Sequence, residues 1–254
     1  MNNTMNNALK ELLYKIADDQ LILGHRNSEW TGVGPLLEED IAFSSMAQDK
    51  VGQSYQLYQM LHQLGEQEPD TVAFMRNADQ FHNCQFVELP VGEYDFSLIR
   101  HFLFDHAEFI RFGMLGESSH EPLAQLSRKI RGELKYHVMH ANTLIKQLGS
   151  ATDESIGRLQ QSLEYALPYA LGIFEASPYE EELIEQGIFA GEAALQQRWT
   201  EQIKKALEPT ALQLPDLQRL QPVTGGRRGQ HTEYLQPLLD EMAEVFRIDP
   251  TAEW

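Results

Sequence analysis

The stretch that decides the fold is FSLIRHFLFDHAEFIRFGML, residues 96–115. Its apolar side chains lie on almost every side of a helix, a pattern typical of a central, buried helix. These apolar positions are Phe96, Leu98, Ile99, Phe102, Leu103, Phe104, Phe109, Ile110 and Phe112. Asp95, just before the stretch, is a residue type suited to cap a helix. We therefore predict a buried helix over residues 96–115 with Asp95 as its cap.

Helical periodicity continues on both sides of this segment, and alternating, strand-like stretches are scarce. Gly24 and the residues after it should end the first helix, and Pro168 should kink or split the helix that starts near Asp153. The other predicted helices cover about residues 8–22, 36–64, 71–77, 123–148, 178–186, 190–207 and 231–246. Because no composition break divides the chain, the sequence predicts an all-α protein with one domain over residues 1–254. A bundle of about four long helices with shorter helices around it fits this pattern.

The charge of the chain excludes two classes of partner. Lys and Arg number 20 against 38 Asp and Glu, a formal net charge of −18 over 254 residues. Nucleic acid and anionic membranes are bound by clustered Lys and Arg, so a field this acidic argues against both. The remaining interpretation is a soluble acidic protein whose charge has another explanation.

Cysteine content and the N-terminus indicate a location. The single cysteine, Cys84, excludes an internal disulfide framework and a thiolate zinc cluster. The opening residues are polar and uncharged, unlike a signal peptide, and no apolar run approaches the ~20 residues that span a bilayer. We expect a cytoplasmic protein.

Helical bundles of this size often hold a di-iron carboxylate centre, which needs a Glu-x-x-His on each of two helices and a Glu from each of the other two. An acidic residue precedes a histidine by three positions twice, at Glu117–His120 and at Asp79–His82. Both pairs fall in predicted turns or irregular stretches, where they cannot point along a bundle. The sequence therefore lacks the di-iron motif.

Several internal carboxylates remain open to two interpretations. Glu133 and His137 stand one helical turn apart, either as an altered metal site or as a buried pair satisfied by hydrogen bonds. Asp49, Asp105 and Glu108, together with Asp40, are internal carboxylates suited to a polar network at the bundle centre. If the chain keeps an altered metal site, its candidate ligands are Asp49, Asp105, Glu108, Glu133 and His137. We refer to these five residues as the degenerate metal candidates.

Residues 225–229, Gly-Gly-Arg-Arg-Gly, precede a predicted helix start. Exposed backbone N–H groups and the helix dipole make such a turn a plausible anion cradle, although it lacks the Gly-Lys-Ser/Thr ending of a nucleotide P-loop. Arg227 and Arg228 would hold an anionic ligand or an acidic group, and a solvated basic turn is the alternative. Cys84 has His82 nearby but no third group to orient a base, so we interpret it as a structural or incidental thiol.

A series of motifs in fixed order resembles the C-subunit family of ring-1,2-phenylacetyl-CoA epoxidase. The resemblance begins with residues 23–32, LGHRNSEWTG, and spans the chain from about Leu21 to Trp254. Further matching segments are 37–40 (LEED), 49–53 (DKVGQ), 71–76 (TVAFMR) with Phe81 and Asn83, 102–105 (FLFD), 133–137 (ELKYH) and 225–233 (GGRRGQHTE). The chain departs from the family at Ser45, where Asn is common, and at Pro90-Val91-Gly92, where the family has a Pro-Asn-Gly turn.

The resemblance implies a ferritin-like four-helix bundle with additional peripheral helices. It also implies a place in a bacterial multi-subunit monooxygenase of phenylacetate catabolism. In that family the A subunit carries the di-iron centre and binds phenylacetyl-CoA, and a reductase subunit supplies electrons from NADPH. The C subunit is similar to A but without the metal, and it pairs with A as a scaffold.

These observations lead to a main hypothesis: a non-catalytic structural subunit, with no cofactor of its own, that binds the A subunit and other epoxidase subunits. When isolated, the chain is expected to form a homodimer. The motif-bearing turns supply the residues expected to contact a partner or an anion, which are Arg26, Glu29, Trp30, Arg227, Arg228 and His231. Two alternatives stay open: a divergent metal-dependent oxidase that acts alone, and an accessory subunit that binds coenzyme A.

Overall fold

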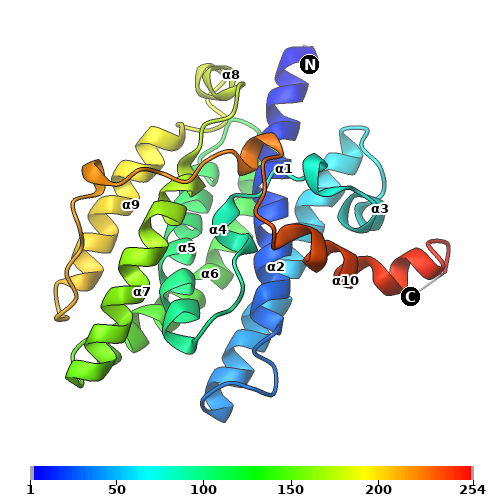
Figure 1. Cartoon of the computed structure of the whole chain (residues 1–254). Helices are drawn as coiled ribbons and strands as arrows, with labels where there is room; N and C mark the ends of the chain where they lie inside the picture. Colours follow the sequence, from blue (N-terminus) through cyan, green and yellow to red (C-terminus); the bar gives the residue numbers. More distant parts are fainter. Residues whose placement is uncertain (1–2, 253–254) are drawn as a thin grey trace. The chain divides into compact units, whose positions relative to one another are not determined.

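The computed structural model of the protein describes residues 3–252, and over these residues the chain is helical throughout, with no strand (Figure 1). The predicted all-α class is therefore confirmed. The ten α-helices of the described residues are α1 (Asn3–Ser28), α2 (Leu37–Gln63), α3 (Pro69–Phe74), α4 (Gln85–Glu88), α5 (Tyr94–Leu115), α6 (Glu121–Leu148), α7 (Asp153–Leu171), α8 (Glu180–Glu185), α9 (Glu192–Leu207) and α10 (Leu235–Ile248).

The chain divides into two compact units. Unit 1 combines Met1–Pro90 with Thr224–Trp254, and unit 2 is the inserted segment Val91–Val223. The single domain expected over residues 1–254 stays a prediction, and its first and last two residues lie outside the described part of the chain. The units are described separately below.

Unit 1 is built on the antiparallel pair α1 and α2, the blue helices of Figure 1. Two hydrogen bonds show the antiparallel direction: Lys10, early in α1, donates to Glu66 just after α2, and Tyr58, earlier in the chain than Glu66, donates to Asp18, which lies later in α1. The predicted end of the first helix at Gly24 is wrong, because α1 continues to Ser28. A Cβ at position 24 would lie 2.9 Å from Val51 Cγ2, so this glycine allows close helix packing rather than a break.

The shorter helices of unit 1 pack around this pair and one another. The helix α10 contacts α3, where the Phe74 and Phe246 rings lie 5.3 Å apart, and α4 contacts α1. The segment from Gly225 to Gly229 contains a single 3-10 turn that leads toward α10. This arrangement brings residues from both ends of the chain into one core.

Unit 2 is organised around α5, which α6, α7 and α9 contact. Its residues are buried almost all round, as predicted for residues 96–115, and the Trp199 indole N–H of α9 donates to the Leu103 carbonyl at 2.9 Å. The predicted cap is wrong: α5 begins at Tyr94, and Asp95 instead binds Arg158 and Ser162 of α7. Residues 96–115 therefore form the centre of this unit.

Pro168 lies inside α7, and this helix is not split. The proline sits in its last turn, where its missing N–H and its ring affect only the turn before the helix ends. The Pro168 carbonyl accepts the Val223 N–H at 2.9 Å, so the returning chain uses a carbonyl at the end of the helix. Within residues 3–252, no helix combines the length and apolar character needed to cross a membrane.

Candidate functional site

Unit 2 contains a buried cluster of imidazoles around one carboxylate, between α5 and α6. Asp105 Oδ2 is hydrogen-bonded to His101 Nδ1, and Asp105 Oδ1 lies 3.7 Å from His137 Nδ1. His140 Nδ1 lies 3.3 Å from His101 Nε2. The helical spacing accounts for the cluster, because positions 101 and 105 share one face of α5, and 137 and 140 share one face of α6.

Burial sets the protonation state of His101. It lowers the pKa of His101 to about 4, although the Asp105 carboxylate pulls in the opposite direction. At neutral pH His101 is therefore a neutral imidazole that donates from Nδ1 to Asp105 and accepts at Nε2 from His140. The result is a fixed tautomer in a hydrogen-bonded chain from a buried carboxylate to the partly exposed His140.

A second buried polar group surrounds Arg111 in the same unit. Arg111 donates from Nε to Glu108 at 2.9 Å and from Nη1 to Glu192 at 2.5 Å, and the three side chains are at most 3% exposed. The two carboxylates pair with the buried guanidinium and accept hydrogen bonds from two of its nitrogens, the arrangement that a buried charge requires. Glu108, a candidate metal ligand, is therefore engaged as the partner of an arginine.

The degenerate metal candidates of unit 2 are only partly brought together, and Asp49 belongs to unit 1. Asp105 and His137 share the cluster, whereas Asp49 lies on α2 of unit 1 and Glu133 is a half-buried residue of α6. Within the described residues, no group of three or more His, Cys, Asp or Glu side chains is arranged to hold a metal ion. With Asp105 bound to His101 and Glu108 to Arg111, this donor set does not fit a di-iron centre.

The Glu117–His120 and Asp79–His82 pairs lie off the long helices, as predicted. The first follows α5 in a turn, and the second spans the short 3-10 helix Ala78–Gln80 and the irregular residues after it. Asp40 also stays out of any central network, because its Oδ1 accepts the backbone N–H groups of Gly32 and Gly34.

Arg227 lies inside unit 1 rather than in an exposed turn. Its guanidinium bonds the Asp19 carboxylate at 2.7 Å, the Lys15 carbonyl at 3.1 Å and the His82 carbonyl at 2.9 Å. The flanking glycines make this approach feasible, since a Cβ at Gly226 would lie 2.4 Å from the Asn83 carbonyl oxygen. The glycine–arginine motif is therefore a strap that fastens the C-terminal segment to α1, while Arg228 is exposed.

The remaining residues expected to meet a partner are also mostly internal. Arg26 donates twice to the Glu88 carbonyl, at 3.0 and 2.8 Å, and once to Glu29 at 2.6 Å. Trp30 is buried against Phe43, with ring centroids 6.1 Å apart. Glu29 is the exposed member of this group.

His231 and Glu88 form a buried contact that joins the C-terminal segment to the end of α4. His231 Nδ1 lies 2.6 Å from Glu88 Oε1, and His231 Nε2 lies 3.1 Å from the Phe81 carbonyl. Glu88 Oε2 accepts both the N–H and the hydroxyl of Thr232 at 2.7 Å. The carboxylate of Glu88 thus has four close polar contacts when Asn83 is included, which gives it a structural role.

Sequence reasoning missed several polar residues that organise unit 1. Asp18 receives hydrogen bonds from Arg76, Tyr58 and the His82 N–H. Burial opposes ionisation of Asp18, but Arg76 holds the pKa of its carboxyl below the usual range. The signal for Asp18 and Asp19 was present, because two adjacent carboxylates interrupt an apolar helix, whereas nothing local marks Glu88.

Cys84 is buried, and burial raises the pKa of its thiol well above the usual range. A thiol that stays protonated is a poor nucleophile and a poor metal ligand. Its backbone N–H donates to Asp19 at 2.8 Å, so position 84 contributes to the same network as Arg227.

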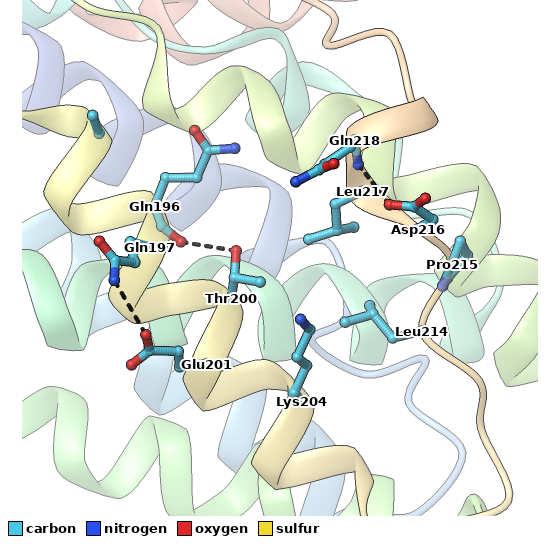
Figure 2. A pocket seen from close by; sticks show the side chains of 11 residues that line it. Gln196, Gln197, Thr200, Glu201, Lys204, Leu214, Pro215, Asp216, Leu217 and Gln218 are labelled. Carbon is cyan, nitrogen blue, oxygen red and sulfur yellow. Dashed lines mark hydrogen bonds between the residues drawn. The ribbon is translucent and has the colours of Figure 1, made fainter.

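On the surface of unit 2, α9 and the chain that follows it enclose a hollow of about 750 Å³ (Figure 2). Its wall combines apolar, amide, hydroxyl and charged side chains, and the backbone carbonyl of Gln196 accepts a hydrogen bond from the Thr200 hydroxyl. Lys204 is the one cation of its lining. None of the residues expected from the sequence lies there.

The described chain is all-helical and contains buried His–Asp and Arg–carboxylate clusters. Comparison with known proteins identifies the family to which a chain of this kind belongs. The family profile described as "Phenylacetic acid catabolic protein" matches residues 1–254, and the chain belongs to this family. It is 31% identical over 249 residues to the C subunit of 1,2-phenylacetyl-CoA epoxidase from Escherichia coli (strain K12). The match covers 98% of this chain and 100% of that protein, so the similarity extends over both chains almost from end to end.

Proposed function

We propose that this chain is the C subunit of a phenylacetyl-CoA epoxidase in phenylacetate catabolism and acts as a non-catalytic partner of the metal-bearing A subunit. The family membership and the full-length similarity to an epoxidase C subunit support the assignment. The supporting role within the complex rests on a surface feature of unit 1.

That feature is an exposed apolar stripe at the start of α2 and the loop before it. Val33, Leu36, Leu37 and Ile41 are each more than 60% exposed. Further along α2, positions 44, 48, 51 and 55 continue the same face at alternating steps of three and four, and Val51 and Tyr55 are exposed there too. This is the spacing with which one helix packs along another, and an exposed series of this kind marks an interaction surface.

The charge around the stripe restricts the partner. Between residues 27 and 75 the single Lys or Arg is Lys50, which is fully buried, while Glu38 is exposed beside the stripe. A partner that covered it would present an apolar helix with neutral or basic neighbours, because like charges across an interface are costly. We take the A subunit to be that partner.

The six residues expected at a partner surface take different places in this proposal. Glu29 and Arg228 are exposed, and we assign them direct contacts with a partner. Arg26, Trp30, Arg227 and His231 would act by holding the turns that present those contacts.

The finer expectations belong to the same proposal. The fold would be ferritin-like, since each unit contains one pair of long helices, α1–α2 and α5–α6. The di-iron centre would reside in the A subunit, with no cofactor in this chain. The protein would be cytoplasmic, would meet other epoxidase subunits through the complex, and would form a homodimer when isolated.

No observation favours the oxidase alternative. Asp105 and Glu108, the two carboxylates of α5 that a metal would need, are hydrogen-bonded to His101 and Arg111. Freeing them would break the buried hydrogen bonds to His101 and Arg111 and leave Glu192 as the remaining carboxylate bonded to Arg111.

Co-expression with the A subunit tests the proposal. We expect the two chains to co-purify, and we expect Leu37→Asp with Ile41→Asp to abolish co-purification with little change in thermal unfolding. Val245→Asp, at a similarly exposed apolar position on α10, is the matched control and should still co-purify. Co-purification of the stripe variant would overturn the assigned surface, and two tightly bound irons in this chain would overturn the non-catalytic role.

A further inference from the structure

Unit 2 carries a groove whose charge is opposite to that of the protein. Two neighbouring hollows, of about 560 and 510 Å³, share Phe109, Gly113 and Arg131 as common lining. Together they are lined by five cations and two carboxylates, in a chain whose net charge is −18. The cations are Arg128, Arg131, Lys135, Arg198 and Lys205.

Most of these cations have no acidic partner. Within residues 6–252, no hydrogen bond or ion pair to the protein involves the charged groups of Arg131, Lys135, Arg198 or Lys205, whereas Arg128 bonds Glu121 and the Gly116 carbonyl. Carboxylates outnumber cations almost two to one in this chain, so pairing would be the ordinary outcome. Four unpaired cations around one groove therefore need a physical reason.

Three of the five cations are also neighbours on one face of α6, where they repel one another. Arg128, Arg131 and Lys135 stand at i, i+3 and i+7, so like charges are neighbours on one face of the helix. Such pairs destabilise a helix by a few tenths of a kcal/mol each, and a bound anion would reverse the sign of the effect.

Arg131 is also positioned before any ligand arrives. Its guanidinium lies over the Phe109 ring, 4.6 Å from the centroid. Gly113 leaves room for it, since a Cβ there would lie 3.1 Å from Arg131 Nε. Stacking on an aromatic face holds the plane of the guanidinium while its N–H edge stays available, which is the geometry that binds phosphate oxygens in a bidentate manner.

We propose that this groove binds a small organic polyphosphate, the chemistry shared by coenzyme A and by nucleoside di- and triphosphates. Arg131 and Arg198 would contact the phosphates, Lys135 and Lys205 would add charge at the two ends, and Phe109 would supply an apolar surface. The combined size of the hollows is that of a small-molecule site, and a small ligand avoids the repulsion that nucleic acid would meet from the rest of the chain. This proposal is independent of the pairing with the A subunit.

The full-length chain is titrated calorimetrically with coenzyme A, ATP and inorganic phosphate at low and moderate salt. We expect a polyphosphate to bind, inorganic phosphate to bind at least tenfold more weakly, and affinity to fall as salt rises. Tighter binding of coenzyme A than of ATP would identify the first as the source of the phosphates, and the reverse order would identify the second.

The variant Arg131→Gln with Arg198→Gln should weaken binding at least tenfold. The matched control is Lys146→Gln with Lys204→Gln, which removes two equally unpaired cations from the same two helices outside the groove; Lys204 faces the hollow of Figure 2. It should change affinity less than twofold.

Three outcomes would overturn the proposal: absence of binding by every phosphate ligand, equal loss of affinity in both variants, or unchanged affinity in the groove variant. If no phosphate ligand binds and the groove variant instead loses co-purification with a protein partner, the groove is a protein contact. Thermal unfolding of both variants checks that these exposed substitutions leave the fold intact.

Discussion

Arg227 and Asp19 form an ion pair although they stand 208 positions apart in the chain, with Arg227 Nη2 2.7 Å from Asp19 Oδ2. Both side chains are 1% exposed. The pair joins the glycine–arginine strap to the middle of α1, and the Lys15 and His82 carbonyls complete the surroundings of the guanidinium. A motif that suggests an anion site in the sequence therefore binds an anion of its own chain.

Replacing Arg227 should destabilise the protein strongly. In Arg227→Met, Asp19 stays buried without its cation, and breaking such a pair costs about 3 to 5 kcal/mol. Urea unfolding followed by circular dichroism should show this as a lower midpoint.

The neighbouring arginine provides the control. Arg228→Met changes an exposed side chain, so the free energy of unfolding should move by no more than ~0.5 kcal/mol. The double variant Asp19→Asn with Arg227→Met should recover part of the loss, because no unpaired charge remains. A double variant as unstable as Arg227→Met alone would contradict the role of the ion pair.

The glycines of the strap should tolerate no side chain. In Gly226→Ala the new Cβ would meet the Asn83 carbonyl oxygen at 2.4 Å, a backbone atom that cannot move aside, so we expect a loss of about 1 to 3 kcal/mol. Gly52→Ala, at a helical position of α2 with nothing within 4 Å, should instead stabilise the protein by about 0.5 to 1 kcal/mol. Thermal unfolding temperatures that move in the same direction for both variants would refute this explanation.

Much of the helical structure could be predicted from residue patterns, because each long helix has its own apolar periodicity. The stretch 96–115 and the stripe of α6 needed no information from elsewhere in the chain. The break expected at Gly24 failed, since the reason for that glycine is the neighbouring helix α2. Asp95 failed as a cap because its partners, Arg158 and Ser162, lie more than sixty residues away.

The candidate site was less predictable for the same reason. Asp105 and His137 were selected as internal polar residues, but the partner that fixes them, His101, looks like one more residue of an apolar helix. The buried state of Arg26 and Arg227 depends on carbonyl groups of Glu88 and His82, which have no signature in a sequence.

The His101 cluster should make stability depend on pH. Because the folded-state pKa of His101 is about 4 and the ordinary value is 6.5, the unfolded chain binds more protons between these values. This contribution to stability is therefore fully present above pH 6.5 and is lost as pH falls toward 4, by about 3 kcal/mol in all. Urea midpoints between about pH 4.5 and 7.5 measure it.

Removing the imidazole should flatten that dependence. His101→Gln keeps an N–H donor for Asp105 but cannot titrate, so its unfolding free energy should fall less steeply below pH 6.5 than that of the unmodified protein. His62→Gln, at a histidine that is 45% exposed, should leave the slope unchanged. Parallel pH profiles for His101→Gln and the unmodified protein would show that His101 does not carry the effect.

Two tyrosines on α2 allow the Asp18 network to be tested by removal of a single oxygen atom. The Tyr58 hydroxyl donates to Asp18 at 2.6 Å and accepts from Arg76 at 3.0 Å, and all of it is buried. Because Arg76 still pairs with Asp18 in Tyr58→Phe, the loss should have the size of buried hydrogen bonds, about 1 to 3 kcal/mol, rather than that of an unpaired charge. Tyr55→Phe, at a 47% exposed position one turn earlier, should change the unfolding free energy by no more than ~0.5 kcal/mol. Equal effects of the two substitutions would contradict a stabilising role of the Tyr58 hydroxyl. The stability of the network would then come from the Arg76–Asp18 pair alone.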